Sequence, residues 1–420
     1  MSQITKPMLL DETFKQKMNI TKGLLGTIAR EGAPQTTNWN FLEELASDGT
    51  FETLYDIGTT FSDTWKDTAA GTEYTFPWML NHIGNVELQD GETLVNRPWL
   101  QMKYAHPFGV QFSQCRAFLR CPSGLAAGTY NIHFAQNWSS LTVRNWHFTL
   151  TQDVPEGGSL AGFRQMPDSA YTTRPVYSYD ADGKTVIETV DAAQGEASGA
   201  TDLGTLAYAT RSDNLNSMQE TFYGWNRWKT SALRQYLNSD AGVGGWWTKQ
   251  DDWDIAPSQL TTKSGFLYHY KALAEDTTKD ATLRANAQAF LDSIKPVKVI
   301  TYPNTVYDDP QGNTPDITYD KVFLPSLEQM YINPQKAGEG EYHERWKRQS
   351  GRETVMAQYS TYPQIITYAV EDHSSAQHVR LRSAYRGYAY FTWCVVSSGY
   401  VSYYYYGAYS ANRFSPLVVL

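Results

Sequence analysis

The sequence predicts an α+β protein in which short strands outnumber a few helices. Three observations support this class. Between residues 50 and 155, apolar and polar residues alternate in short runs that end at turn-forming residues, and residues 376–420 return to the same pattern. Helical spacing is concentrated between residues 230 and 330. Strands and helices do not alternate regularly, which argues against a doubly wound parallel sheet.

Strand patterns dominate the first half of the chain. Arg116–Cys121 and Tyr130–Phe134 flank a turn rich in Pro and Gly, and a further strand is expected at Val143–Leu150. Residues 177–205 are rich in Asp, Gly, Ala, Ser and Thr, so long loops or an exposed hairpin are expected there. One short strand is expected within that stretch, at Thr185–Val190.

Helix signatures follow in the second half. Thr230 or Ser231 can cap a short helix with apolar residues on one face. Residues 280–294 place apolar side chains on one stripe, and Pro296 stops that helix. The capping-box pattern Ser326–Gln329 predicts the start of another short helix.

The chain divides into three expected parts. Residues 1–50 carry weak helical spacing over 8–30, which suits a surface helix or an oligomerisation or docking segment equally well. We expect a β-rich domain at 51–160 and a ligand-binding domain at 161–420.

Composition excludes several classes of protein. The net charge of −9 disfavours nucleic acid and anionic membranes as general partners. There is no secretory signal and no run of about 20 apolar residues, so we expect no membrane insertion. The odd count of cysteines (Cys115, Cys121 and Cys394) indicates synthesis in a reducing cytosol. A virion protein released by lysis meets these conditions.

Tyrosine is concentrated near the C-terminus. Residues 385–409 hold nine of the 29 tyrosines, and no Asp, Glu or Lys occurs from His373 to Leu420. Tyr with Ser and Gly is the composition of an antibody paratope. In a strand, Tyr403 and Tyr405 face one side and Tyr404 and Tyr406 the other, so both faces carry phenols. Burial would require a partner for every hydroxyl, which favours a binding surface over a core strand.

Framework residues are expected between these tyrosines. Val379 and Leu381 alternate with Arg380 and Arg382, as on a half-buried strand. Ser397–Gly399 predicts a turn. Phe414, Leu417 and Val419 can form the last strand, and Pro416 predicts that it lies at a sheet edge.

Candidate chemical sites are weak. His343–Glu344 lacks a second histidine at helical spacing, and His373 and His378 are expected to be loop or core residues. The acidic pairs Asp251–Asp252 and Asp308–Asp309 are expected in solvated loops. We therefore expect no catalytic residue, no metal and no cofactor.

Several motifs occur in a characteristic order: Tyr223–Asn238, Ile294–Lys298, Phe323–Gln329, Val379–Arg386 and Asn412–Pro416. Together they resemble the C-type-lectin-fold variable proteins of diversity-generating retroelements in gut phages and prophages. The resemblance covers residues 205–420 well, 75–165 more loosely and 1–50 poorly. It implies a C-type-lectin-like C-terminal domain with a variable region at about 385–410.

The resemblance also implies which side chains vary. In this family, randomised adenines convert AAC-type codons into a restricted set of residues. Positions of the resulting types are the implied ligand-binding residues Tyr388, Tyr390, Phe391, Cys394, Val396, Tyr400, Ser402, Tyr403, Tyr404, Tyr405, Tyr406, Tyr409 and Ser410. The implied framework is Ala389, Trp393, Val395, Gly399, Val401, Ala408 and Arg413, with Tyr385, Thr392 and Ser398 left unassigned. On this scheme Cys394 is an exposed cysteine.

These inferences predict a non-enzymatic receptor-binding protein on the tail or surface of a virion, made in the host cytoplasm. Its expected partners are a bacterial surface protein or glycan and other virion proteins, and we expect a homo-oligomer, with a trimer as one option. Calcium-dependent sugar-binding motifs such as Glu-Pro-Asn are absent. A structural virion protein that uses the tyrosines as a subunit interface is the main alternative, and a carbohydrate-active enzyme is a weaker one.

Overall fold

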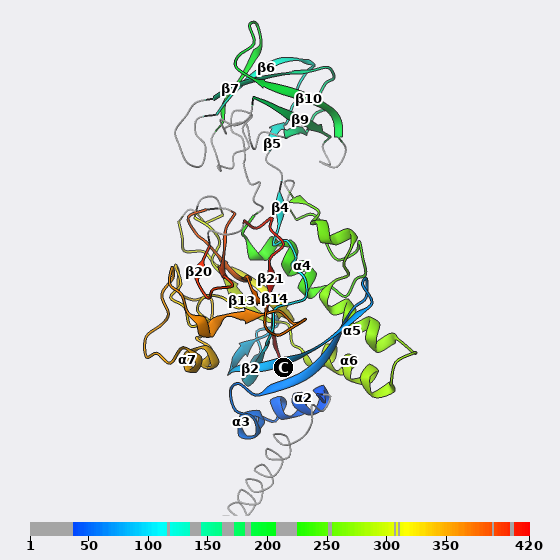
Figure 1. Ribbon diagram of the computed structural model, residues 1–420, viewed down its shortest axis with the longest axis vertical. Coiled ribbons are helices and arrows are strands. Elements are labelled where there is room, and N and C mark those ends of the chain that lie inside the picture. The colour runs from blue at the N-terminus through cyan, green and yellow to red at the C-terminus, as the bar shows by residue number, and fades with distance from the viewer. Residues whose placement is uncertain are drawn as a thin grey trace, which may run out of the picture.

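The computed structural model describes residues 37–115, 118–134, 144–161, 172–180, 186–206, 225–250, 254–305, 308–309, 311–388, 390–403 and 407–420. Within these ranges the protein is α+β and rich in short strands, as the sequence predicts (Figure 1). The expected helix at residues 8–30 and the pair Asp251–Asp252 lie outside the described residues.

The central sheet joins the two ends of the described chain. Its five strands run in the order β1 (Thr60–Asp67), β2 (Thr72–Glu87), β3 (Thr93–Met102), β22 (Leu417–Val419) and β15 (Val322–Phe323), and every neighbouring pair is antiparallel. β22 is therefore an interior strand, and its expected position at a sheet edge is wrong. Pro416 precedes the strand, and its carbonyl accepts a hydrogen bond from Met102 N (3.0 Å).

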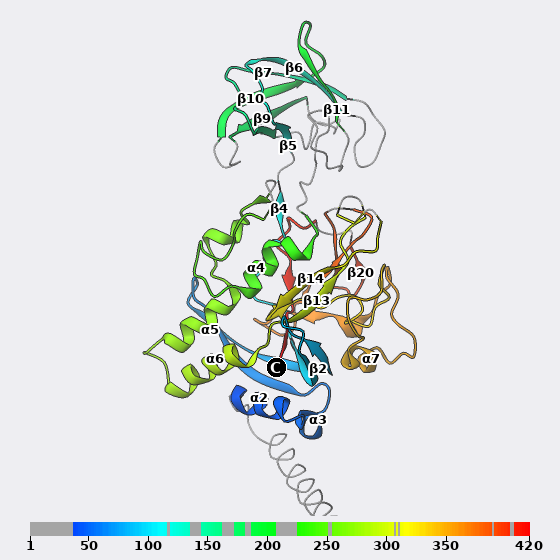
Figure 2. The ribbon, with the colours of Figure 1, turned by 180° about the vertical axis from the view of Figure 1, so that it is seen from behind.

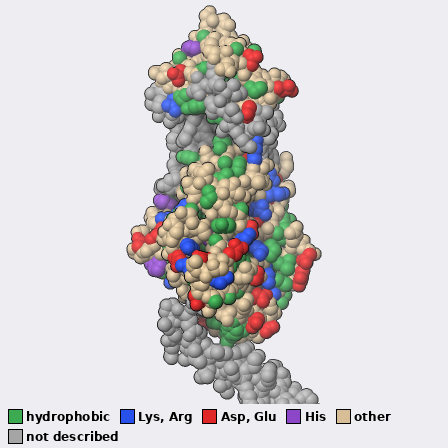
Figure 3. All heavy atoms as spheres, turned by 90° about the vertical axis from the view of Figure 1, so that its right-hand side faces the viewer, with side chains coloured by type: hydrophobic (Ala, Val, Ile, Leu, Met, Phe, Trp, Pro, Cys, Tyr) green, Lys and Arg blue, Asp and Glu red, His purple; other side chains and the backbone are tan. Residues whose placement is uncertain are grey.

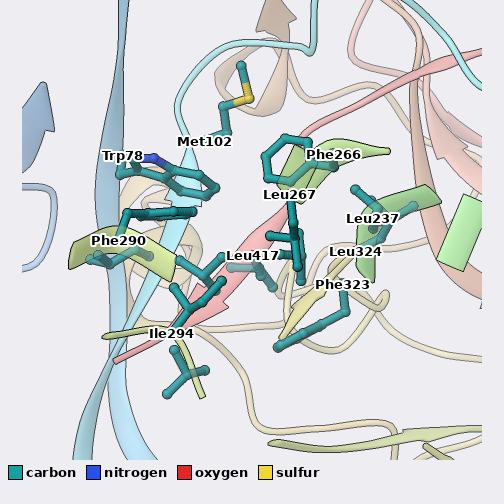
Figure 4. Close-up of a cluster of buried hydrophobic side chains, with 14 of the residues drawn as sticks. Trp78, Met102, Leu237, Phe266, Leu267, Phe290, Ile294, Phe323, Leu324 and Leu417 are labelled. Atoms are coloured by element: carbon teal, nitrogen blue, oxygen red, sulfur yellow. The ribbon is translucent and has the colours of Figure 1, made fainter. Parts of the chain in front are cut away.

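Helices from both halves of the chain cover this sheet: α2 (Trp39–Ser47), α3 (Phe51–Leu54), α4 (Ala232–Asn238), α5 (Phe266–Glu275) and α6 (Ala281–Ser293). All five contribute to one hydrophobic core. Figure 4 shows part of this core, with labelled side chains from α4, α5 and α6. The Phe290 ring on α6 contacts Trp39 (4.9 Å between centroids) and stacks on Trp78 (5.6 Å). Residues 39–54 therefore contribute side chains to the core, and part of the expected docking or oligomerisation segment, 1–50, packs in it.

The helix predictions are largely confirmed. Ser231 caps α4, as predicted, by accepting from Arg234 N (3.1 Å). The helix predicted over 280–294 is α6, which Asp280 caps and which ends at Ser293, before Pro296. Ser326 and Gln329 make the reciprocal capping-box hydrogen bonds (3.1 and 3.2 Å), but the chain there forms a turn and not a helix.

A second sheet has its own hydrophobic cluster. Its seven strands run in the order β11 (Thr201–Leu206), β6 (Gly128–Phe134), β7 (Arg144–Leu150), β10 (Val186–Gln194), β9 (Thr173–Tyr179), β8 (Gly158–Ala161) and β5 (Phe118–Cys121). The strands expected at 116–121, 130–134 and 143–150 are confirmed over their described residues, 118–121, 130–134 and 144–150. In residues 177–205, β9 and β10 pair as a hairpin, which was one of the two expectations, and β10 contains the described part of the strand expected at 185–190. β11 is a further strand that was not expected.

The structure therefore does not divide the chain into two parts at residue 160, where a domain boundary was expected. Residues 37–115 and 225–420 are here called the core unit, which holds the main hydrophobic core and a further cluster within residues 327–401. Strands β5–β11 form the second sheet and lie between these two ranges in the sequence. The alternation of apolar and polar residues identified individual strands but did not show which strands pair with one another. Figures 1 and 2 show β4 (Gln114–Cys115) at the end of the core unit from which the chain leads to the second sheet.

Smaller sheets complete the core unit. Three two-stranded pairs join β4 with β12 (Asp254–Ile255), β13 (Val297–Thr301) with β14 (Asp316–Asp320), and β16 (Thr367–Tyr368) with β17 (Ala376–Gln377). A four-stranded sheet has the order β20 (Val401–Ser402), β19 (Thr392–Val395), β18 (Val379–Ala384) and β21 (Arg413–Phe414). The remaining elements are α7 (Glu344–Ser350) and the 3-10 turns Trp228–Thr230, Ser258–Thr261 and Pro363–Ile365.

The surface of the core unit carries both signs of charge. Figure 3 shows acidic and basic side chains interspersed over its lower part. Opposite charges form pairs such as Lys66–Asp276 (3.8 Å). None of the helices in the described ranges combines the length and the apolarity that crossing a membrane requires.

Candidate functional site

Seven aromatic side chains cluster beside the four-stranded sheet. This aromatic face consists of Tyr359, Tyr385, Tyr388, Tyr390, Phe391, Trp393 and Tyr403. At its centre the Tyr385 and Tyr403 rings stack at 3.6 Å and 21°. The Tyr388 ring lies beside this pair, 5.6 Å from Tyr385 at 25° and 6.1 Å from Tyr403 at 33°. Trp393, Phe391 and Tyr359 contact Tyr403 at steeper angles, with centroids 5.3–6.0 Å away.

The aromatic face has a buried base and an exposed rim. Trp393 and Tyr390 are buried, the latter 5% exposed, whereas Tyr388 is 41% and Tyr359 48% exposed. Tyr385, Phe391 and Tyr403 are half-buried between these layers. The cluster can therefore offer ring surface to a ligand while its inner rings anchor it to the core.

A buried asparagine holds the loop that carries these rings. The Asn226 Nδ2 amide donates to the carbonyls of Tyr385 (3.1 Å), Tyr388 (2.7 Å) and Phe391 (2.7 Å). Its Oδ1 accepts from Asn304 Nδ2 (3.0 Å), and both asparagines are fully buried. Since all three acceptors are main-chain atoms, this clamp fixes the loop without depending on the loop's side chains.

A buried arginine performs the same task on the adjoining segment. Arg380 on β18 donates to the carbonyls of Gly407 (3.0 Å) and Ser410 (3.1 Å) and to the Thr392 hydroxyl. Gly407 directly follows residues 404–406, which lie outside the described residues. Arg380 is fully buried, and that burial lowers the pKa of its guanidinium to about 10, so it stays charged at neutral pH.

The comparisons with known proteins concern this same region. The family model described as "Domain of unknown function (DUF6273)" matches residues 197–413. The chain belongs to the DUF6273 family. Neither the comparison with curated proteins nor that with solved structures gave a match. The segment matched by DUF6273 contains the whole aromatic face with Asn226 and Arg380, whereas β1–β3 and β22 of the central sheet lie outside it.

Further polar contacts support the loops that carry the aromatic face. Gln335 Oε1 accepts from Arg386 N (2.8 Å) and from Trp393 Nε1 (3.3 Å). Arg382 donates to the Leu324 carbonyl (2.7 Å) and to Gln329 and Glu339. Arg380 and Arg382 alternate with the apolar residues Val379 and Leu381 in the sequence, and all four side chains are buried because both sides of β18 are covered.

The pair Asp308–Asp309 also departs from expectation. Both carboxylates are buried, not solvated: Asp309 lies 3.4 Å from Arg386 Nη2, and Asp308 lies 3.4 Å from Arg227 Nη1. Arg227 binds Asp316 through two hydrogen bonds of 2.7 and 2.8 Å. These ion pairs fix the segment behind the aromatic face, which makes their role structural.

The implied ligand-binding residues divide by burial. Tyr388 is exposed, and Phe391, Tyr400, Tyr403, Tyr409 and Ser410 are half-buried. Tyr390, Cys394, Val396 and Ser402 are buried, so the structure does not present their side chains to a ligand. Tyr404, Tyr405 and Tyr406 lie outside the described residues, as does Ala389.

Cys394 is the clearest correction. It was expected to be exposed, but it is 2% exposed and donates through Sγ to the Ser402 carbonyl (3.0 Å). Burial raises the pKa of its thiol to about 11, which leaves it protonated at neutral pH. It therefore lies in the core as a small apolar residue.

Sequence reasoning missed Tyr359, which comes from a different segment. Its ring contacts Trp393 (5.4 Å), and its backbone is left-handed at φ +57°, an uncommon conformation for a residue with a large side chain. Its N–H donates to the Val401 carbonyl (3.0 Å), which helps to hold this conformation. No local pattern around residue 359 predicts this placement.

The chemistry of the aromatic face is that of neutral phenols. Burial raises the pKa of Tyr359 and of Tyr385, so both hydroxyls stay protonated at physiological pH. In the described ranges no group of three His, Cys, Asp or Glu side chains is placed to hold a metal ion. The arrangement suits contact and hydrogen bonding.

Proposed function

We propose that this chain is a receptor-binding protein of a virion, carried on the tail or particle surface, that grips a bacterial surface ligand through its aromatic face. The observation that carries the proposal is that Tyr388 and Tyr359 are exposed at the rim of the aromatic face. The loop that carries Tyr388 is fixed by hydrogen bonds from Asn226 to main-chain carbonyls. Rigid tyrosines at the rim supply contact area at low entropic cost.

The main-chain clamps also support diversification of the loop. Asn226 and Arg380 bind carbonyl oxygens, which every residue type provides, so rim side chains can be exchanged while the loop keeps its conformation. This arrangement is what the implied variable region at 385–410 requires. We propose Tyr388, Phe391, Tyr400, Tyr403, Tyr409 and Ser410 as exchangeable contacts, together with Tyr404–Tyr406.

We further propose a C-type-lectin-like scaffold for the C-terminal part of the chain. In support, the motifs that carry the resemblance converge around the aromatic face: Asn226 binds its loop, Gln329 accepts from Arg382, and Val379–Ala384 forms β18. On the virion the chain would act with other virion proteins and as a homo-oligomer, because several copies raise the effective affinity of a weak single site.

Binding to the bacterium that the encoding phage infects tests the proposal. Tyr388→Ala should lose cell binding, whereas Tyr368→Ala, an equally radical change at an exposed tyrosine of β16, should retain it. Equal binding by both variants would contradict the proposal. Loss of oligomerisation in Tyr388→Ala would instead favour a structural virion protein that uses the aromatic face as a subunit interface.

A further inference from the structure

The aromatic face has an exposed ring, Tyr388, beside its central stacked pair. Tyr403, Tyr385 and Tyr388 are inclined by 21–33° to one another, and Tyr388 is 41% exposed. Aromatic rings favour offset stacking with another flat apolar surface. The exposed ring of Tyr388 can therefore receive a ring-shaped group of the ligand.

Within residues 373–420, the described arginines are either buried or paired with an acid. Residues 373–420 contain no Asp, Glu or Lys, and their only cations are four arginines. Arg380, Arg382 and Arg386 are buried, and Arg413 pairs with Glu371 (2.8 Å). The exposed Arg352 on the neighbouring segment lies over the Tyr362 ring (5.3 Å). An anionic ligand would thus find no free cation in this segment to offset its loss of hydration.

Hydroxyl groups supply the polar part of the face. Tyr385 hydrogen-bonds with both Tyr359 and Tyr403, and burial keeps the Tyr359 and Tyr385 phenols neutral. A ligand that offers a ring face and neutral hydroxyls at the ring edge matches both features. A hexopyranose combines the two, whereas a purely apolar peptide side chain uses only one.

Tyr359 adds a contact from outside the segment implied to vary. Its left-handed backbone persists only because surrounding contacts hold it, and such conformations concentrate at binding sites. Its ring centroid lies 6.0 Å from that of Tyr403. A tyrosine that stays constant while its neighbours are exchanged would keep the site specific for one class of ligand, although the preferred member of that class changes.

The geometry points to a neutral glycan as the ligand of the aromatic face, with a sugar ring stacked on Tyr388 and Tyr359 as a constant second contact. This inference rests on the proposed function and names the class of its ligand. Binding should not depend on salt, because no ion pair forms across the interface.

An array that carries neutral glycans, acidic glycans and purified bacterial surface proteins tests the inference with the full chain. We expect retention on neutral glycans, equal at 0.15 and 0.5 M NaCl, and weaker by about tenfold in both Tyr388→Ala and Tyr359→Ala, the effect of one aromatic contact. Tyr368→Ala is the matched control and should bind as wild type does.

The outcomes separate the two proposals. Retention only on acidic glycans with salt dependence, or only on surface proteins through Tyr388, would overturn the neutral-glycan inference and leave receptor binding standing. The absence of any glycan binding would also overturn it. Cell binding that is unchanged in Tyr388→Ala would overturn the proposed function itself.

Discussion

Substitution of Asn226 by Ala should release the loop of the aromatic face while the rest of the core unit stays folded. The two N–H groups of the amide serve three carbonyls, so about two full hydrogen bonds are lost, worth about 1 kcal/mol each. The Phe391 carbonyl also accepts from Tyr385 N (2.8 Å) and keeps that partner. The Tyr388 carbonyl loses its 2.7 Å donor, which adds at least about 1 kcal/mol.

The sum is about 3 kcal/mol of local opening free energy, which corresponds to about a hundredfold faster amide exchange. Hydrogen–deuterium exchange read by mass spectrometry should show this acceleration at Tyr385 N and Ala408 N, which bond within the loop. Asn286→Ala is the control: Asn286 is buried on α6 and accepts only from Trp39 N (3.3 Å). Loop exchange that is unchanged in Asn226→Ala, or equally fast in both variants, would refute the clamp.

Three further predictions concern burial. Cys394, whose thiol pKa burial raises to about 11, should resist iodoacetamide at pH 8 until urea unfolds the protein; rapid labelling of the folded chain would place it at the surface. Burial raises the pKa of Asp63 to about 6, above its unfolded value, so the folded state binds this proton more tightly. The contribution of this carboxyl to stability should therefore fall by about 2 kcal/mol as pH rises from 4 to 7. Urea titrations of wild type and Asp63→Asn should therefore differ in pH dependence over that window, and parallel profiles would contradict the assignment. Tyr390 is buried, so Tyr390→Ala should lower the free energy of unfolding by about 3 kcal/mol. Tyr388 is exposed, so Tyr388→Ala should lower it by under about 0.5 kcal/mol. Similar losses of stability in thermal unfolding would show that the two tyrosines do not differ in burial.

The sequence was sufficient for local structure because local structure depends on neighbours in the chain. Ser231 and Asp280 have the side chains that cap helices, and both do so. The turn at Ser397–Gly399 is confirmed, with Gly399 at φ +81°. The position of β22 in the sheet was not predictable. A proline argues against an interior strand only when the proline itself is part of the strand, and Pro416 lies one residue before β22 begins.

The site was only partly predictable for a related reason. The tyrosine composition located the segment of the aromatic face, but composition does not separate exposed Tyr388 from buried Tyr390. Arg380 alternates with apolar residues and so resembles a surface residue, yet it is buried because loop carbonyls distant in sequence replace water around it. Tyr359 approaches the face only through tertiary contacts.

The central claim is that a fixed polar frame presents exchangeable side chains, and sequencing tests it most directly. The gene's neighbourhood should contain a near-copy of the codons for residues 380–420, with adenines at the exchangeable positions, beside a reverse transcriptase gene. Sibling isolates should then differ at Tyr388 and at Tyr403–Tyr406 and agree at Asn226 and Trp393. The absence of such a repeat, or substitutions spread evenly over rim and frame, would contradict the account.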